Sequence, residues 1–504
     1  MIGLSSYNRF APLAKVYRKL AEAPSNGVST DTAGGTGPGG AYSPADLRAA
    51  YSIPTHLSIP AKTETVALFE QGGFFQSDVD VFLKQNHLPS VPVTVRGVNG
   101  FGGGVNDPGV ELEAVLDIDS VIGFNWALKQ VQVYEDGDDP FGVALLDALA
   151  AIGSDQTAQV VSISYGLDEV QQGAAQIKAE GTLFAQLATQ GITVFVSSGD
   201  QGAYGRTGFN SYNAPDPGSQ PFITSVGGTS LYTGPNQVYG SEEVWNNLGS
   251  GFGATGGGVS KFWTIPSWQV NGGVSVAKAN GGSSKMRNVP DVAAVASSLT
   301  GFAVYSAING GWIQIGGTSL SSPLWAGYMS VLDSAQRALG LGQVGFFNPT
   351  LYKVAETNGG LNDVVDGTNG NANLFPGLPG YSAGFGYDNC TGWGSMFGPL
   401  FMYYYLASPT STGTVPAMPR GLNATATKTT VTVKWSPVST ANGYIAIIGT
   451  SSFFGVVPLE DDVTRGTGTV LRGLTPNTTY AILLAALDPA GASPFNEIFI
   501  TTAK

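Results

Sequence analysis

The stretch GGTSLSSP, Gly316 to Pro323, places Ser319 where it could act as a nucleophile. The apolar run that follows predicts a helix, with Pro323 expected in its first turn, where proline is tolerated. The N–H groups and the dipole at a helix N-terminus stabilise a developing negative charge, which suits acyl transfer. Thr318 and the serines around it are also ordinary helix-capping residues. The motif alone leaves both interpretations open.

A serine nucleophile needs a base that takes its proton, and this base is most often a histidine. The chain has only two histidines, His56 in YSIPTHLSIP and His87 in KQNHLPS. Both stand next to prolines rather than acids, so we expect them to lie in surface loops. A histidine would also be protonated below about pH 5 and could not act as a base there. The sequence therefore argues against a Ser-His-Asp enzyme.

Carboxylates could supply the base instead. Glu113 and Asp117 are four residues apart in VELEAVLDIDS, so a helix would bring them to one face. Their neighbours are apolar, and two close carboxylates cannot both ionise easily, so one pKa rises and a proton is shared. That arrangement would give a base suited to acidic pH. The alternative is a pair of solvated acids on a helix surface.

Asp200 stands at the end of another apolar run, ITVFVSSGD. In α/β sheets, functional groups gather at the C-terminal ends of the strands. A protonated aspartic acid there could donate a hydrogen bond to an oxyanion. The alternative is an aspartate in a glycine-rich turn, which is common.

Strand-like apolar runs alternate with helical patterns through the centre of the chain. This alternation predicts an α/β fold with a largely parallel sheet. The expected strands are Glu64–Gly73, Val160–Gly166, Ile192–Asp200 and Phe222–Leu231, and the expected helices are Val110–Phe124, Gly173–Gly191 and, after a turn, Ile315–Gly340.

The domain organisation follows from shifts in composition. We expect an N-terminal extension or linker (1–41), an α/β domain (42–408), a Pro/Ser/Thr linker (409–417) and a small all-β sandwich (418–504). In the last part, LRGLTPNTTYAI resembles the tyrosine corner of a fibronectin type III module, with Tyr480 as the corner residue. Trp435 and Tyr444 are expected in the core of that sandwich.

Composition limits the possible functions. Of 504 residues, 42% are hydrophobic and only 12% are charged, and the net charge is −13. The sequence has no basic region of the kind that binds nucleic acid, and no run of about 20 apolar residues that would span a membrane. A single cysteine excludes an intramolecular disulfide. A low content of charged residues limits unfolding by acid and so suits an acidic environment. An ordinary acidic surface that keeps the protein soluble is the alternative explanation of this composition.

The segments ELEAVLD, VSSGDQG and GGTSLSSP, in this order and at these separations, resemble the sedolisin family of serine-carboxyl peptidases. SPADLRAAYSIP, TGGGVS and RNVPDVAA add to the match, which covers roughly 42–405. The resemblance implies a subtilisin-like parallel sheet with helices on both faces. It also implies that Ser319 is the nucleophile, Glu113 the general base and later acid, Asp117 the residue that holds Glu113, and Asp200 the protonated oxyanion donor.

The resemblance extends to a supporting network. Glu70 in LFEQGG matches a glutamate that some relatives use in this network. Tyr165 stands where those relatives have a tryptophan, so the outer hydrogen bonds of this chain are expected to differ, although a tyrosine could still form a hydrogen bond there.

A structural Ca²⁺ site is also implied by the resemblance. LNDVVDG and AGFGYDNCTGWG offer carboxylates and backbone carbonyls, which are the oxygen ligands that Ca²⁺ prefers. Asx-turns in a glycine-rich loop are the alternative. The expected ligands are the side chains of Asp363 and Asp388 and the carbonyls of Val364, Gly384 and Gly386.

The resemblance therefore predicts an acid-active, secreted, monomeric endopeptidase that acts on protein or peptide substrates through an acyl-enzyme. A tripeptidyl peptidase and a non-enzymatic adhesion or binding protein are the alternatives. Relatives are made with a long N-terminal prosegment, which would serve as an intramolecular inhibitor or chaperone. Only about 41 residues precede the expected α/β domain, so we expect most of the prosegment to be absent. Substrate preference and the ligand of the sandwich are not readable from the sequence.

Overall fold

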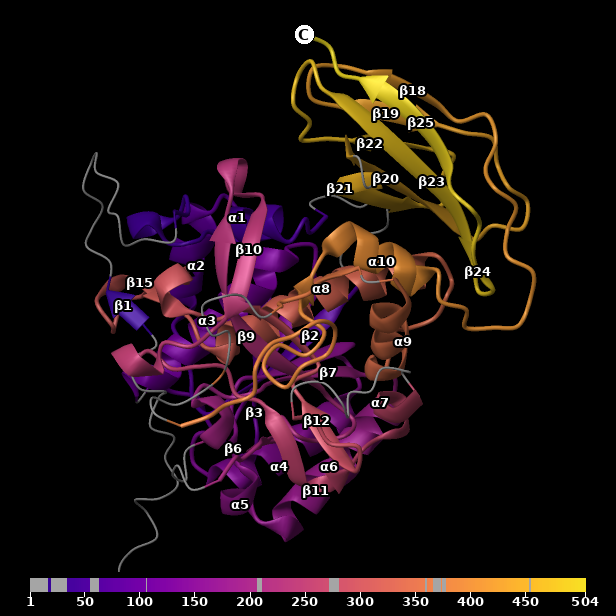
Figure 1. Ribbon diagram of the computed structural model, residues 1–504. Coiled ribbons are helices and arrows are strands. Elements are labelled where there is room, and N and C mark those ends of the chain that lie inside the picture. Colours follow the sequence, from indigo (N-terminus) through magenta and orange to yellow (C-terminus); the bar gives the residue numbers. More distant parts are fainter. Residues whose placement is uncertain are drawn as a thin grey trace, which may run out of the picture.

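The computed structural model describes residues 17–19, 34–54, 63–105, 107–205, 211–271, 281–358, 360–365, 373, 378–452 and 455–504 (Figure 1). His56 lies outside the described residues, and His87 is exposed after helix α2.

An eight-stranded sheet forms the centre of the larger domain. Its strands follow the order β10-β9-β7-β5-β2-β4-β3, and β13 also pairs with β9. Every pairing is parallel except that of β10 with β9. The predicted α/β fold with a largely parallel sheet is therefore confirmed. The strands are β2 Thr65–Glu70, β3 Val93–Gly97, β4 Gln130–Glu135, β5 Val160–Ile163, β7 Thr193–Ser197, β9 Thr224–Thr233, β10 Tyr239–Val244 and β13 Val292–Val295.

Helices cover both faces of this sheet, and the strand side chains alternate accordingly. On β2, Val66 and Leu68 pack with α3 (Pro108–Phe124) and α8 (Thr318–Ala338). Ala67 and Phe69 point to the other side, where α4 and α6 lie. Helices α1 (Pro44–Ala50) and α2 (Gln76–Gln85) join the first face, and α4 (Phe141–Asp155) and α6 (Ala174–Thr189) form the second.

Helix α8 differs from its prediction in one respect. It begins at Thr318, so Pro323 lies in its second turn and not in the first. Proline has no N–H, and the carbonyl of Ser319 therefore loses its usual partner four residues later. The Ser164 hydroxyl approaches this carbonyl to 3.5 Å, but it lies closer to Asp117, at 2.7 Å.

Smaller elements complete the domain. Ser43 caps α1 through a capping box with Asp46. Part of the N-terminal stretch forms β1 (Tyr17–Lys19), which pairs with β15. The other elements are β6 Leu167–Asp168, β8 Pro215–Asp216, β11 Gly258–Thr264, β12 Met286–Val289, β14 Phe302–Ser306, β15 Gly311–Ile315, β16 Leu361–Asn362, β17 Ser395–Met396, α5 Glu169–Gln172, α7 Ser267–Asn271, α9 Asn348–Asn358 and α10 Gly398–Leu406.

The C-terminal part is the expected β-sandwich of two antiparallel sheets. Tyr480 accepts a hydrogen bond from the Thr475 N–H at 2.9 Å, which is the geometry of a tyrosine corner. Trp435 and Tyr444 are buried with ring centroids 5.2 Å apart. One sheet contains β18 Asn423–Ala426, β19 Val431–Lys434 and β22 Gly468–Leu471, and the other contains β20 Gly443–Ser452, β21 Gly455–Thr464, β23 Thr479–Asp488, β24 Gly491–Ala492 and β25 Asn496–Thr501.

The sandwich packs against the larger domain through its five-stranded sheet (Figure 1). On β20, Ile445 and Ile447 belong to the hydrophobic core that contains α8, whereas Tyr444 belongs to the core of the sandwich. The Asn442 side chain donates to the carbonyl of Leu339, just after α8, at 2.8 Å. Helix α8, whose first turn contains Ser319, is thus held at its far end by the sandwich.

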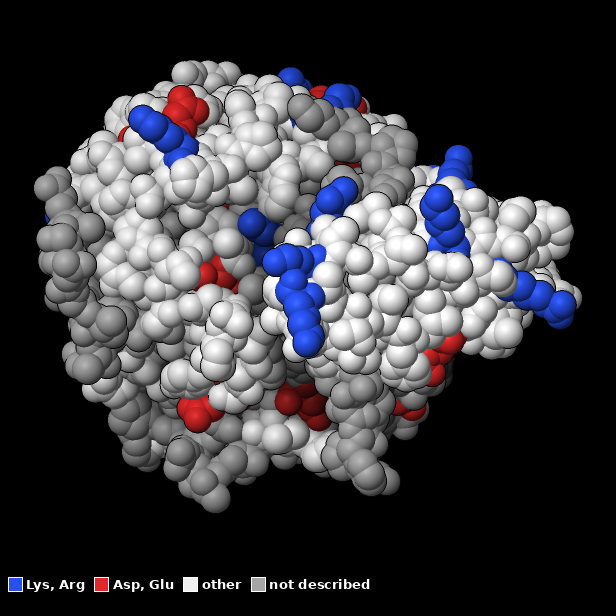
Figure 2. Space-filling model, turned by 90° about the horizontal axis from the view of Figure 1, so that it is seen from above, with Lys and Arg blue, Asp and Glu red and all other residues white. Residues whose placement is uncertain are grey.

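The surface carries few charges. Figure 2 shows one face of the molecule on which charged side chains are sparse and scattered, consistent with the 12% charged residues of the chain. Within the described residues, no helix combines the length and the apolar character needed to cross a membrane.

Candidate active site

The predicted site residues come from separate elements that meet at one edge of the sheet. Glu70 is the last residue of β2, Tyr165 follows β5, and Asp200 follows β7. These strands are parallel, so their carboxyl ends lie at the same edge. Glu113 lies on α3 and Ser319 at the start of α8, and these two helices pack against each other on one face of the sheet.

Ser164 links the nucleophile turn to the acids of α3. Its hydroxyl lies 2.7 and 2.9 Å from the two carboxylate oxygens of Asp117 and donates to that carboxylate. The Ser319 Oγ in turn donates to the Ser164 carbonyl at 3.4 Å. Ser164 therefore contacts both parts of the site.

Glu70 and Asp117 are buried near other carboxylates, which disfavours their ionised forms. Burial raises the pKa of Asp117 well above its usual value, and the neighbouring Glu113 charge raises it further. The pKa of Glu70 is also well above normal, first because of burial and then because of Asp117 and Glu113. Groups with such shifts hold protons at pH values where ordinary carboxyls are ionised.

Tyr165 completes this network. Its hydroxyl donates to Glu70 Oε2 at 3.0 Å, and both side chains are buried. This bond lowers the pKa of Glu70 and partly offsets the effect of burial. The tyrosine that replaced the expected tryptophan thus still contacts the glutamate.

Asp200 is fixed beside the nucleophile turn by Thr318. Asp200 Oδ1 accepts from the Thr318 N–H at 2.8 Å and from its hydroxyl at 2.6 Å. A Cβ on Gly317 would lie 2.8 Å from Asp200 Oδ2, and Gly317 has φ of +102°, so only glycine fits there. Because Oδ1 already accepts two hydrogen bonds, a proton on this acid belongs on Oδ2.

A cavity of about 60 Å³ opens at this edge of the sheet. Glu113, Ser164, Asp200 and Thr318 line it, and Ser319 is 1% exposed next to Thr318. A candidate base, a candidate oxyanion donor and the nucleophile turn therefore surround one small space. Such a site could perform acyl transfer.

Comparison with solved structures identifies the family. The chain resembles Pseudomonas sedolisin, a serine-carboxyl proteinase complexed with two molecules of pseudo-iodotyrostatin. The TM-score is 0.64 and the sequence identity 32%, over 72% of this chain and 97% of that one. The chain belongs to the sedolisin family.

Curated proteins of the sedolisin family extend the comparison. The chain is 33% identical over 414 residues to sedolisin of Pseudomonas sp. (strain 101), covering 79% of this chain and 65% of that protein. It is 27% identical over 383 residues to tripeptidyl-peptidase 1 of Rattus norvegicus, and the match covers 72% of this chain and 64% of that protein. The chain thus spans less than two thirds of the length of these relatives. No family model matches it.

The calcium ligands predicted from the sedolisin resemblance lie around one loop. The Gly386 N–H donates to Asp363 Oδ2 at 2.8 Å, and the Gly384 N–H donates to Asp388 Oδ2 at 3.1 Å. Burial raises the pKa of Asp388 to about 7 and also raises that of Asp363. Val364 is buried beside Asp363. Asp363 follows β16 and contacts the glycine-rich loop that carries Asp388, and two carboxylates placed in this way fit a hard cation with oxygen ligands.

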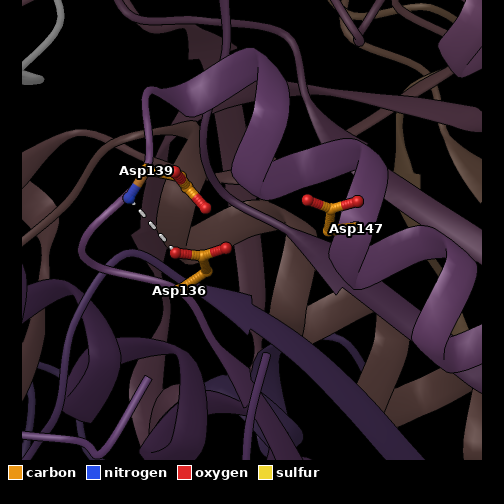
Figure 3. A group of neighbouring side chains, drawn as sticks. All are labelled: Asp136, Asp139 and Asp147. Carbon is orange, nitrogen blue, oxygen red and sulfur yellow. Dashed lines mark hydrogen bonds between the residues drawn. The ribbon is translucent and has the colours of Figure 1, made fainter. Parts of the chain in front are cut away.

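Three further acids lie between the end of β4 and helix α4, at the edge of the sheet where the carboxyl ends of the parallel strands meet. Asp136, Asp139 and Asp147 each bring a carboxylate oxygen within 4.8 Å of the others (Figure 3). The Asn99 side-chain amide lies within hydrogen-bonding distance of all three. The run EDGDDP indicates acidity here, but nothing in the structure points to an ion.

Sequence reasoning missed Ser164 and Thr318, the two residues that orient the predicted acids. Both are small hydroxyl residues next to a predicted site residue, Ser164 before Tyr165 and Thr318 before Ser319. A hydroxyl at the end of a buried strand is a weak signal, because capping and turn positions also favour it. Their partners, Asp117 and Asp200, are distant in the sequence and come close only in the folded chain.

Proposed function

We propose that this chain is an acid-active serine-carboxyl peptidase that hydrolyses peptide bonds through an acyl-enzyme on Ser319. The observation that carries the proposal is the meeting of Glu113, Asp200 and the Ser319 turn at one cavity. The family of the chain supports the same conclusion.

In the proposed reaction, the Ser319 oxygen attacks the substrate carbonyl while Glu113 takes the serine proton. The negative charge that develops on the carbonyl oxygen accepts a hydrogen bond from a proton on Asp200 Oδ2. Glu113 then gives its proton to the leaving amine, and the acyl-enzyme forms. A water molecule repeats these steps and releases the acid. Asp117, held by Ser164, keeps Glu113 in place.

Replacement of the nucleophile tests the proposal most directly. Ser319→Ala should abolish cleavage of an unfolded protein at pH 3–5, apart from the residual rate left by binding and oxyanion stabilisation. Ser321→Ala is the matched control, because the Ser321 hydroxyl is buried on the same helix and donates to the Ala294 carbonyl at 3.0 Å. Full proteolysis by Ser319→Ala would overturn the mechanism. A binding protein without catalysis would show no turnover even as wild type.

Endopeptidase action is proposed first, and tripeptide release is the second candidate because tripeptidyl-peptidase 1 is among the relatives. N-terminally acetylated peptides distinguish the two, since an enzyme that binds a free amino terminus cannot process them. Internal cleavage of acetylated peptides supports the endopeptidase. Tripeptides released only from free N-termini would support the alternative.

A structural calcium ion is part of the proposal. Asp363 and Asp388 would hold it together with the carbonyls of Val364, Gly384 and Gly386, and it would neutralise the two carboxylates. Chelation should lower the melting temperature of the wild type by several degrees, because an ion that binds only the folded state stabilises it. Asp388→Asn should melt at the same temperature with and without chelator. An unchanged melting temperature of the wild type on chelation would exclude a stabilising ion.

The remaining predictions belong to the same proposal. They are secretion, action on protein or peptide substrates as a monomer, and domain limits at 41, 408 and 417. The low charge content supports an acidic extracellular setting.

A further inference from the structure

The sandwich and the larger domain share one hydrophobic core. Ile445 and Ile447 of β20 and Leu487 of β23 are fully buried. They belong to the same cluster as Leu332 and Ala335 of α8. Domains of one chain usually meet through more polar contacts and move relative to one another, unless their interface is large and hydrophobic. The shared core therefore indicates that the sandwich does not move freely on a tether.

Helix α10 lies between the sandwich and α8. Its sequence, GPLFMYYYL, is apolar or aromatic on all sides, which is typical of a helix that is covered all round. On one side, the centroid of the Phe401 ring lies 6.1 Å from that of Trp325 on α8. On the other side, the centroid of the Tyr403 ring lies 4.4 Å from that of Phe495 in the sandwich. Without the sandwich, this second side of α10 would face solvent.

The contacts of α10 continue along α8 towards the nucleophile. The Tyr328 hydroxyl on α8 donates to the carbonyl of Gly398, the first residue of α10, at 2.7 Å. The Trp325 side-chain N–H donates to the carbonyl of Ala293 on β13 at 2.8 Å. Trp325 follows Ser319 on the same helix by about two turns. The sandwich is thus connected through α10 to the part of α8 that carries Ser319.

A close approach and the linker fix how the two domains fit together. A Cβ on Gly443, the first residue of β20, would collide with the side chain of Leu339 just after α8. The N–H groups of Thr410 and Ser411 in the linker donate to the carbonyl of Pro489 in the sandwich, at 2.9 and 3.0 Å. The start of the linker is therefore bound to the sandwich and does not act as a free tether.

We propose that the sandwich is a positioning domain, which holds α8, and with it Ser319, in the geometry that the reaction needs. A displacement of about 1 Å at a reacting atom can lower a rate about 10²-fold, so a small shift of this helix would matter. This role differs from that of a tethered module that binds a substrate or a surface. The kinetic part of the inference rests on the proposed peptidase function.

Two neighbouring isoleucines on β20 provide a matched pair for the test. Ile447 and Ile448 are both fully buried, but Ile447 belongs to the core shared with α8 and Ile448 to the core of the sandwich. Replacing either by alanine removes buried methyl groups and should lower the melting temperature by several degrees. Ile447→Ala should also lower kcat about three- to tenfold and leave KM within about twofold, whereas Ile448→Ala should keep kcat within about twofold.

The kinetics are measured at pH 4 and well below the melting temperature of each variant, so that both remain folded. Ile447→Val keeps most of the side chain and should have a kcat close to that of the wild type. An equal kcat in wild type and Ile447→Ala would overturn the proposal, and so would equal losses in the two alanine variants. If Ile447→Ala does not fold, a cut in the linker decides.

This cut tests the sandwich as a whole. Residues 411–415 are exposed, so a recognition site for a sequence-specific protease, inserted after Gly413, can be cut in the folded full chain. The cut protein should elute as one particle in gel filtration, melt in a single transition and keep its kcat. Two separated pieces, of which the N-terminal one keeps full kcat, would overturn the proposal.

Failure of the peptidase function remains distinguishable. If the wild type cleaves no peptide, hydrogen exchange of the turn from Gly316 to Pro323 is measured by mass spectrometry in Ile447→Ala and Ile448→Ala. Faster exchange of this turn in Ile447→Ala alone supports the positioning role without catalysis. Equal exchange of the turn in both variants would overturn it.

Discussion

Helix α3 carries two groups of buried acids on different sides, and they have different environments. The site group consists of Glu113 and Asp117 on α3 together with Glu70 from the end of β2. The rear group consists of Asp78, Glu111 and Asp119, of which Asp78 comes from α2. All of these side chains except Glu113 are at most 2% exposed.

The site group has hydroxyl partners and reaches the cavity. Ser164 donates to Asp117, Tyr165 donates to Glu70, and Glu113 lines the cavity. In the proposed reaction, this group can therefore exchange protons with a substrate.

The rear group is buried, and it packs against β14 and the turn that follows this strand. The hydroxyl of Ser306 donates to Glu111 at 2.5 Å, with the Asn309 amide 3.4 Å away. In the part of the chain that the structure describes, neither carboxylate oxygen of Asp119 has a hydrogen-bond partner. Burial, followed by the charges of Glu111 and Asp78, raises the pKa of Asp119 well above normal. Burial, with a smaller contribution from Asp78, raises the pKa of Glu111 to about 7.

The difference shows that similar buried acids can serve chemistry or only structure, depending on access to the cavity. The rear group stays buried most easily when it is neutral, because a buried charge without a cation is costly. Acidic pH would thus favour the fold as well as the proposed reaction. Each prediction below separates these two roles.

The largest expected effect is the difference in kcat between two glutamate-to-glutamine substitutions on α3. Glu113→Gln cannot take a proton and should lower kcat about 10²- to 10⁴-fold at pH 4. Glu111→Gln should change kcat less than about threefold, because a Glu111 with a pKa of about 7 is already neutral at that pH. Steady-state kinetics on one peptide, together with the melting temperature of each variant, measures the contrast. Similar losses in both variants would remove the distinction between the two groups.

The second effect concerns stability against pH. The folded pKa of Glu111 lies above the usual 4.5, so the folded state holds its proton longer than the unfolded state. The stabilisation that this proton provides is complete below about pH 4.5 and is lost as the pH rises to about 7, which amounts to about 3 kcal/mol for this group. Glu111→Gln should therefore gain up to about 3 kcal/mol of stability relative to wild type between these pH values, as measured by denaturant unfolding.

The control for this experiment is Glu497→Gln, which removes an exposed carboxyl from the sandwich. Its stability should follow that of the wild type across the same pH range. If Glu111→Gln also follows the wild type, the rear group does not couple the fold to acid.

The sequence predicted the site group better than the rear group, for a physical reason. The spacing of Glu113 and Asp117 places both on one helix face, and this relation is local. Glu111 and Asp119 have no such signal, because a helix of a globular protein is expected to expose its polar side. In α3, 13 of 17 residues are buried, so acids that would normally face solvent are enclosed by α2 and β14. Only tertiary packing reveals them.

Tertiary packing also explains the other differences between sequence and structure. The strands and helices could be predicted from their apolar periodicity, because burial on two faces leaves a strong pattern. Pro323 was placed wrongly in the first turn because the helix begins at Thr318, and the exact start of a helix is not fixed by apolar periodicity. A hydrogen bond from Tyr165 could be expected from the sequence, but the atom that accepts it, Glu70 Oε2, is visible only in the fold.

The smallest effect is expected at Tyr165, at the outer end of the site group. Its bond to Glu70 lowers the pKa of Glu70, which burial and the charges of Asp117 and Glu113 raise well above its usual value. Tyr165→Phe should therefore leave Glu70 neutral. The loss of one buried hydrogen bond should reduce kcat/KM only about two- to tenfold, with an unshifted pH–rate profile. Tyr134→Phe, which removes a hydroxyl 3.1 Å from Asp155, is the matched control. A loss of a hundredfold or more in Tyr165→Phe alone would mean that the outer hydrogen bond holds Glu113 in its working position, so that the site group extends to Tyr165.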